Sequence, residues 1–358
     1  MSDPVAWDLA QRVAVRVAGR ESSGTPQTGS LQPDFEELTS LAEELVAQET
    51  GLSSLSGPAR ARVTDRAGWV QVNMAGFRRL LSPLAAKLEP RLGRSSSVMT
   101  QAARAVAGVQ VGTILGWMST RVLGQYDLLL TEEGRDEDQD IVYYVGPNVV
   151  GLEDRFGFPP REFRLWLALH EVTHRAQFTG VPWLKGHFLS LVEKAVNAVD
   201  PDPRRILDGL RRAAEDIWAG RNPLAEGGLL GVVAGPEERA ILEQVQAFMS
   251  LLEGHGDVTM DRAGKGRIPN AEHFSEVLRE RRRQASGAAK LFQQLIGLEA
   301  KLRQYEQGEQ FIAAVEKVGG PELFSTVWRG PEWLPSLAEV RDPARWIERV
   351  RSQSNGTG

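Results

Sequence analysis

The sequence contains no cysteine among its 358 residues. Disulfide bonds are therefore excluded, and so is every zinc site that is built on thiolate ligands. A chain without cysteine suits a reducing compartment, and the acidic start Met1–Pro4 is not followed by the apolar core of a signal peptide. We therefore expect a cytoplasmic protein.

An excess of basic residues is also lacking. The chain has 42 Lys and Arg against 47 Asp and Glu, which gives a formal net charge of -5. Domains that bind nucleic acid usually carry a basic face or stripe. The one basic run, Arg279–Arg283, is typical of a solvated helix face, so the sequence predicts no nucleic-acid partner.

Long apolar runs are missing as well. The longest candidate is the uncharged segment Ala105–Thr120, whose 16 residues fall short of the roughly 20 that a membrane-spanning helix needs. Within it, Gly108, Gly112 and Gly116 recur at four-residue spacing and lie on one helix face, where they permit close packing of another helix. The segment predicts a buried helix and no stable membrane span.

Histidine is scarce, and this makes its placement informative. Of five histidines in the chain, two lie in the sequence His170-Glu171-Val172-Thr173-His174. On an α-helix, residues four apart share a face, so both imidazoles could hold one zinc ion at about 2.0–2.1 Å. The glutamate beside the first ligand can act as general base toward a zinc-activated water. The motif predicts one Zn²⁺ per chain, bound by His170 and His174, with Glu171 as the catalytic residue.

The surroundings of the motif predict one long helix over residues 161–178. Pro160 suits a first helical turn, and Gly180 and Pro182 are typical of a helix end. Gln177, one turn after His174, is a candidate for the second shell of ligands or for the cleft. A helix whose histidines only form hydrogen bonds is the alternative, and a di-iron bundle would need a second Glu-x-x-His element that the sequence lacks.

A catalytic zinc needs a third protein ligand. The longer metzincin motif, H-E-x-x-H-x-x-G-x-x-H, has a glycine and a third histidine ligand after the second histidine. Here the corresponding positions are Gln177 and Gly180, so the third metzincin ligand is absent. The best candidate is Glu253, at the edge of the apolar face of a helix predicted over 236–260, since a carboxylate there is costly unless it is paired or bound to metal. His255 is the alternative ligand.

Two further features of this predicted helix bear on the site. Asp257 lies one turn after Glu253 and is a candidate to orient a ligand from the second shell. Gly254 and Gly256 would let another helix approach closely.

The chain resembles a known family, the type 2 zincin-like metallopeptidases. The similarity is carried by the signature His170–Phe178, which reads HEVTHRAQF, and it extends over most of residues 30–350. Other segments that resemble the family are Tyr144–Asn148, Glu253–His255, Gln304–Gly308, Trp333–Pro335 and Trp346. The resemblance implies a zincin-like site with His170 and His174 as zinc ligands and Glu171 as catalytic residue.

The expected fold is mainly α with a small β hairpin or sheet. Strands are predicted over 125–130 and 140–145, joined by an acidic loop over 131–138. Segment 141–145 is expected to offer a sheet edge to which an extended peptide adds as a strand, which would bring Tyr144 near the cleft. Helices are predicted at the following ranges: 34–50, 58–64, 67–90, about 97–123, 161–178, 184–199, 203–219, 236–260, 270–285, 286–307, 308–318 and 336–351.

The expected organisation is one zincin-like domain. Residues 1–33 are predicted to form an arm and linker, 34–351 the domain, with sub-lobes 34–180 and 181–351 on either side of the active-site cleft, and 352–358 a disordered tail. The prediction for function is a zinc-dependent hydrolase, more narrowly a metalloprotease with a peptide or protein substrate. The alternatives are a zincin-fold protein that binds or regulates without catalysis, and a metal-dependent hydrolase of a small non-peptide amide.

Overall fold

The computed structural model describes residues 4–19, 31–92, 97–126, 140–198, 235–283 and 298–355. The chain divides into two compact units. The first unit takes residues up to Gly180 and the returning segment Thr259–Ser275, and the second takes Val181–Val258 and Glu276–Gly358. The predicted helix at 203–219 and the acidic loop over 131–138 lie outside the described residues.

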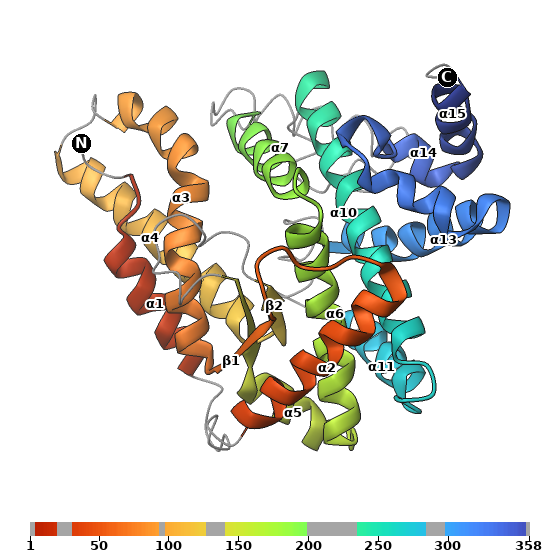
Figure 1. The fold of residues 1–358 in the computed structure, drawn as a ribbon. Coiled ribbons are helices and arrows are strands. Elements are labelled where there is room, and N and C mark those ends of the chain that lie inside the picture. Colours follow the sequence, from red (N-terminus) through yellow and green to blue (C-terminus); the bar gives the residue numbers. More distant parts are fainter. Residues whose placement is uncertain are drawn as a thin grey trace. The chain divides into compact units, whose positions relative to one another are not determined.

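The prediction of a mainly helical chain with a small sheet is confirmed (Figure 1). The first unit contains helices α1 (Trp7–Gly19), α2 (Gln32–Thr50), α3 (Arg66–Leu92), α4 (Ser97–Ser119), α5 (Gly146–Phe156) and α6 (Pro160–Gly180). The second contains α7 (Leu184–Ala198), α13 (Leu298–Phe324), α14 (Leu337–Arg341) and α15 (Pro343–Asn355), with 3₁₀ turns η3 (Ser325–Trp328) and η4 (Pro331–Trp333). Helices α10 (Pro236–Ala263) and α11 (Ala271–Arg283) have residues in both units.

The described strands form one three-stranded sheet in the order β1-β3-β2. β2 (Gly124–Tyr126) pairs antiparallel with β3 (Ile141–Val145), as predicted, and β1 (Arg60–Thr64) pairs parallel with β3. β3 is therefore the central strand, and all five of its residues are buried. The expectation that 141–145 offers an edge to a peptide is wrong, because both sides of β3 are already hydrogen-bonded within the sheet.

Residues 58–64 were expected to be helical, and this prediction is also wrong. Residues 60–64 form β1, in which the exposed Arg60 and Arg62 alternate with less exposed neighbours. That period of two is the pattern of a strand with one covered face. Helix α5, which the sequence did not predict, begins at Gly146-Pro147 and ends at Gly157, whose φ of 66° suits a left-handed helix cap.

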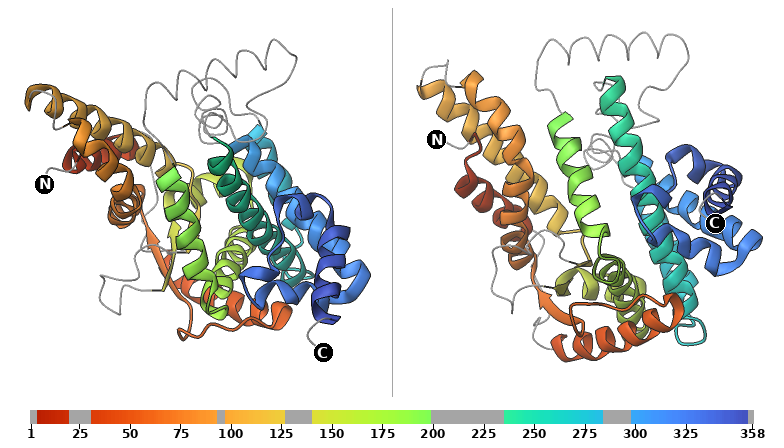
Figure 2. Two further views of the ribbon diagram at one scale, coloured as in Figure 1. Left: turned by 90° about the horizontal axis from the view of Figure 1, so that it is seen from above. Right: turned by 45° about the horizontal axis from the view of Figure 1, so that its top comes forward.

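Helices α1, α3 and α4 pack together in the first unit, as both views of Figure 2 show. The glycine face of α4 lies against α1, in line with the close packing that the spacing permits, but α4 is not buried all round as predicted, because Val106 and Val109 are 57% and 44% exposed. A Cβ added to Gly108, Gly112 or Gly116 would come within 2.3–2.7 Å of a backbone carbonyl oxygen of α1 or of the residue before it. Residues 7–19, expected as part of an arm, are thus packed as helix α1. No helix in the described part of the chain combines the length and apolar character needed to cross a membrane.

Aromatic packing holds the returning segment of the first unit against α6. Phe274 is fully buried and contacts Phe163 and Trp166 of α6, with ring centroids 5.3 and 6.2 Å away. Asn270 donates from its backbone and side-chain nitrogens to Glu162 Oε2, at 3.2 and 3.0 Å. These contacts explain why residues 259–275 belong with α6, although they are far from it in sequence.

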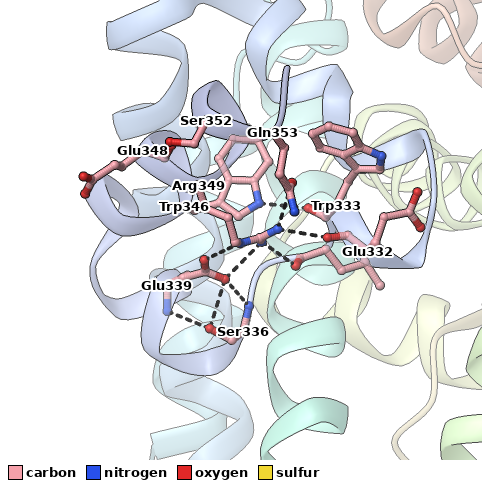
Figure 3. Close-up of polar contacts among 10 residues, drawn as sticks. Glu332, Trp333, Ser336, Glu339, Trp346, Glu348, Arg349, Ser352 and Gln353 are labelled. Carbon is pink, nitrogen blue, oxygen red and sulfur yellow. Dashed lines mark hydrogen bonds and ion pairs between the residues drawn. The ribbon is translucent and has the colours of Figure 1, made fainter. Parts of the chain in front are cut away.

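The second unit has its own core, built from α10, α13, η3, α14 and α15. Trp346 is fully buried in it and donates from Nε1 to the carbonyl of Trp333 at 2.9 Å (Figure 3). Arg349 binds both carboxylate oxygens of Glu339, at 2.7 and 3.1 Å, and Glu339 completes a capping box with Ser336 at the start of α14. The segment around Trp333 and Trp346, which resembles the family, therefore stabilises the C-terminal helices.

Helices α10 and α13 touch backbone to backbone within this unit. A Cβ on Gly254 would lie 2.5 Å from the carbonyl carbon of Gly308, and a Cβ on Gly308 would lie 2.0 Å from the carbonyl oxygen of Ser250. The expectation that Gly254 permits a close helix approach is confirmed. The predicted break near residue 307 is wrong, because Gly308 lies inside α13, which deviates from helical geometry only at Gly320.

Gly308→Ala is expected to lower the free energy of unfolding by about 1–3 kcal/mol, because α10 and α13 must separate to make room for the methyl group. Urea denaturation measures this change. Gly186→Ala in α7 is the matched control, since a Cβ there meets no atom within 4 Å, and it is expected to be neutral or stabilising. An equal response of both variants would contradict the close contact.

Candidate active site

His170 and His174 lie one turn apart on α6, which begins at Pro160 as predicted. Their rings face each other nearly at right angles, with an interplanar angle of 89° and centroids 4.7 Å apart. The two Nε2 atoms are 3.2 Å apart. The helix thus brings the two predicted zinc-ligand atoms close together.

The separation of these nitrogens suits a shared metal ion. Two ligands that each lie about 2.0–2.1 Å from a tetrahedral zinc are separated by roughly 3.3 Å. Both residues are partly exposed. The pair therefore meets the geometric requirement for two of the ligands of a zinc site.

Gln177 lies within hydrogen-bonding distance of the second histidine. Its Oε1 lies 3.0 Å from His174 Nδ1, and its side chain is fully buried in α6. An amide oxygen only accepts, so the neutral ring carries its proton on Nδ1, and the lone pair on Nε2 is the one that could bind a metal. The sequence analysis proposed Gln177 for the second shell, and its contact with His174 suits that role.

Gln177→Ala is expected to weaken zinc binding about 10–100-fold, because the loss of an outer partner frees the ring of His174 to rotate. Competition with a chromophoric chelator measures the zinc Kd. Thr179→Ala is the control, since the Thr179 hydroxyl only donates to the carbonyl of Arg175. An unchanged Kd in Gln177→Ala would exclude the orienting role.

Glu171 lies between the two histidines in sequence and is 7% exposed. Its side chain reaches strand β2, against which α6 packs (Figure 1). The approach is close enough that a Cβ on Gly124 would lie 2.6 Å from Glu171 Cγ and 2.7 Å from its Oε1. The sequence analysis did not single out Gly124, which lies just before the strand predicted over 125–130 and inside the observed β2.

Tyr144 lies in the core beside this glutamate rather than at an open cleft. It is fully buried on β3, stacks on Phe35 at 3.9 Å, and shares a 2.8 Å hydrogen bond with the Thr39 hydroxyl. Burial raises the pKa of Tyr144 far above its usual range, and the negative charge of Glu171 raises it further. The phenol therefore stays neutral and serves as a packing and hydrogen-bonding group of the sheet.

A buried arginine anchors the histidine helix. Arg175, next to His174, is 1% exposed and binds both carboxylate oxygens of Asp140, at 2.9 and 2.6 Å. It also binds Glu43 of α2 at 2.6 Å and the carbonyl of Gly57 at 2.7 Å. This one side chain ties α6 to α2 and to the residue that precedes β3. The sequence analysis missed it, although a charge on a buried helix is a usable signal.

The third-ligand candidates lie on α10, in the second unit. Glu253 is 7% exposed and follows the buried Leu251 and Leu252. His255 is 6% exposed and packs between Phe324 and Trp328, with ring centroids 5.6 and 5.0 Å away. Asp257 is half-buried on the same helix. The roles of Glu253 and Asp257 stay predictions.

The remaining histidines pack against aromatic side chains. His273 is exposed and contacts the ring of Phe158 edge-on at 5.7 Å. His187 packs against Trp183 and Phe248, and burial together with the charge of Lys194 lowers its pKa. The contacts of His273 and His187 are those of packed side chains, and neither residue is a candidate metal ligand.

Comparison with protein families shows which family the chain belongs to. The sequence model for zincin-like metallopeptidases matches residues 5–347, nearly the whole chain. The chain belongs to the zincin-like metallopeptidase family. In that family setting, the pair of facing histidines next to a buried glutamate is a candidate metal centre of a hydrolase.

A solved structure is similar to this zincin-like metallopeptidase over almost its full length. It is the crystal structure of a protein from Chloroflexus aurantiacus, described as a candidate hydrolase with a novel fold. The two share 29% sequence identity, the match covers 97% of this chain and 99% of that chain, and the TM-score is 0.70. Among curated proteins, none matches the chain.

Proposed function

We propose that this zincin-like metallopeptidase is a zinc-dependent hydrolase that cleaves peptide bonds. The observation that carries the proposal is the pair of imidazole nitrogens 3.2 Å apart with the buried Glu171 next to the first of them. Membership of a metallopeptidase family and the similarity to a candidate hydrolase support the same class of reaction.

The proposed ligand set is His170, His174 and Glu253. Two features support Glu253 over His255. A carboxylate that is 7% exposed on an apolar helix needs a compensating charge. The ring of His255 is taken up by aromatic packing.

Glu171 carries the proton transfers in this proposal. A zinc ion held by these ligands would polarise the substrate carbonyl and acidify a water molecule. Glu171 takes a proton from the attacking water and returns it to the nitrogen of the leaving amine. The peptide C–N bond breaks, one product ends in a carboxylate and the other in an amine, and Glu171 regains its charge.

The edge strand β2 is the proposed dock for the substrate backbone, in place of β3. Within the described sheet, β2 pairs only with β3 on one side. An extended peptide can add to such an edge through its backbone. The contact between Gly124 and Glu171 puts this strand next to the general base, which favours a peptide over a small amide.

A peptide-library assay followed by mass spectrometry tests the proposed reaction. We expect cleavage that requires zinc and is abolished by a chelator and restored by added zinc. If the zinc-loaded protein cleaved no library member, the peptidase proposal would be overturned. Activity on small amides alone would instead make the protein a hydrolase of small non-peptide amides.

Glu253→Ala tests the ligand set. It is expected to weaken zinc binding by at least about 100-fold, because a lost ligand costs more than the 10–100-fold of a lost outer partner. His255→Phe, which preserves the aromatic packing, is expected to keep the zinc Kd. The reverse pattern would make His255 the ligand.

A further inference from the structure

The geometry points to Gly124 as the positioning residue of the general base: its missing side chain is what lets the carboxylate of Glu171 lie against strand β2. This inference deepens the proposed function and rests on it. It concerns how one residue on a neighbouring element holds the catalytic group in place.

The contact leaves no room for a side chain. A Cβ on Gly124 would lie 2.6, 2.7 and 2.9 Å from Cγ, Oε1 and Cδ of Glu171, and these are its three nearest atoms. Carbon atoms of real side chains do not approach this closely without a shift of the neighbour. The atoms that would be displaced are therefore those of the general base.

The backbone itself does not demand glycine at this position. Gly124 is not among the glycines with positive φ in the described residues, so any residue could adopt its conformation. Glycine weakens a strand because it loses more entropy on folding and offers nothing to pack. Its place in a three-residue strand therefore calls for another explanation, and the close approach of Glu171 supplies one.

Strand β3, which pairs with β2, also lies near the carboxylate of Glu171. Gly124 is in register with Tyr144 of β3, and the charge of Glu171 acts on the Tyr144 phenol. The carboxylate thus lies against the β2–β3 pair and is only 7% exposed. Because this pair is held rigidly by its hydrogen bonds, it restricts the rotamers that Glu171 can adopt, which is the preorganisation that proton transfer needs.

A double-mutant cycle tests the contact without any measurement of activity. Thermal unfolding is followed for wild type, Gly124→Ala, Glu171→Ala and the double variant. We expect Gly124→Ala to lower Tm by several degrees in the wild-type background and to leave Tm nearly unchanged in the Glu171→Ala background, where the space is free. An equal fall in both backgrounds would overturn the inference.

Zinc content and kinetics test the positioning role. Gly124→Ala is expected to keep zinc and KM, and to lose kcat by about 100-fold, as for a displacement of roughly 1 Å. Gly151→Ala in α5 is the matched control, because a Cβ there meets nothing within 4 Å, and it should keep wild-type kcat. A Gly124→Ala variant with wild-type kcat would overturn the positioning role. If the wild-type protein were inactive, the proposed function would be overturned. The double-mutant cycle would still test whether Gly124 and Glu171 are in contact, because it measures Tm and not activity.

Discussion

Glu171→Gln is expected to bind zinc as wild type does but to lose about 10²–10⁴-fold in kcat/KM for peptide hydrolysis. Glutamine keeps the size of the side chain and its place against Gly124, but it cannot accept a proton from water. Steady-state kinetics on a cleaved library peptide, with metal analysis of the same sample, measure both parts of the expectation.

The control for this substitution is Glu272→Gln, an exposed residue on α11. It changes the net charge by the same amount and is expected to keep full activity. If Glu171→Gln retained more than about a tenth of the wild-type kcat/KM, general-base catalysis by Glu171 would be contradicted. Loss of zinc in this variant would instead indicate that Glu171 holds the site together.

Arg175→Met is expected to lower the free energy of unfolding by about 3–5 kcal/mol, the cost of breaking a buried ion pair by removing one partner. The methionine leaves Asp140 and Glu43 without the guanidinium that neutralises them, and their side chains are only 13% and 28% exposed. Because Arg175 follows His174 directly, zinc affinity should fall as well. Urea denaturation and zinc titration measure the two effects.

Arg161→Met is the matched control, because Arg161 pairs with Glu37 and so also joins α6 to α2. That pair is exposed and screened by solvent, so its loss should leave the free energy of unfolding almost unchanged. The double variant Arg175→Met/Asp140→Asn should recover part of the lost stability, since it removes one uncompensated charge. Equal effects of Arg175→Met and Arg161→Met would contradict the anchoring role.

The parts of this protein that could be predicted from sequence are those with a local signal. Helix α6 carries its own start and stop residues, Pro160 and Gly180, and the four-residue spacing of His170 and His174 fixes their common face. The glycine spacing in α4 likewise predicted a face for close helix packing, although not the partner helix. In each case the relevant residues lie within a few turns of one another.

The parts that could not be predicted depend on partners far away in sequence. The parallel pairing of β1 with β3 joins residues 60–64 to 141–145, and the short alternation of Arg60 and Arg62 with apolar residues is by itself a weak signal for a strand. Arg175 finds its partners 35 and 132 residues away. The edge position of β2 follows only once β1 occupies the other side of β3, so β2 could not be proposed as the dock for a peptide from the sequence alone.

Zinc stoichiometry of the purified full-length protein tests the central claim most directly. After equilibration with zinc and removal of the excess, metal analysis by mass spectrometry is expected to find about one zinc per wild-type chain and almost none in His174→Ala. A wild-type chain that holds no zinc under these conditions, or a His174→Ala chain that holds as much as wild type, would contradict the account.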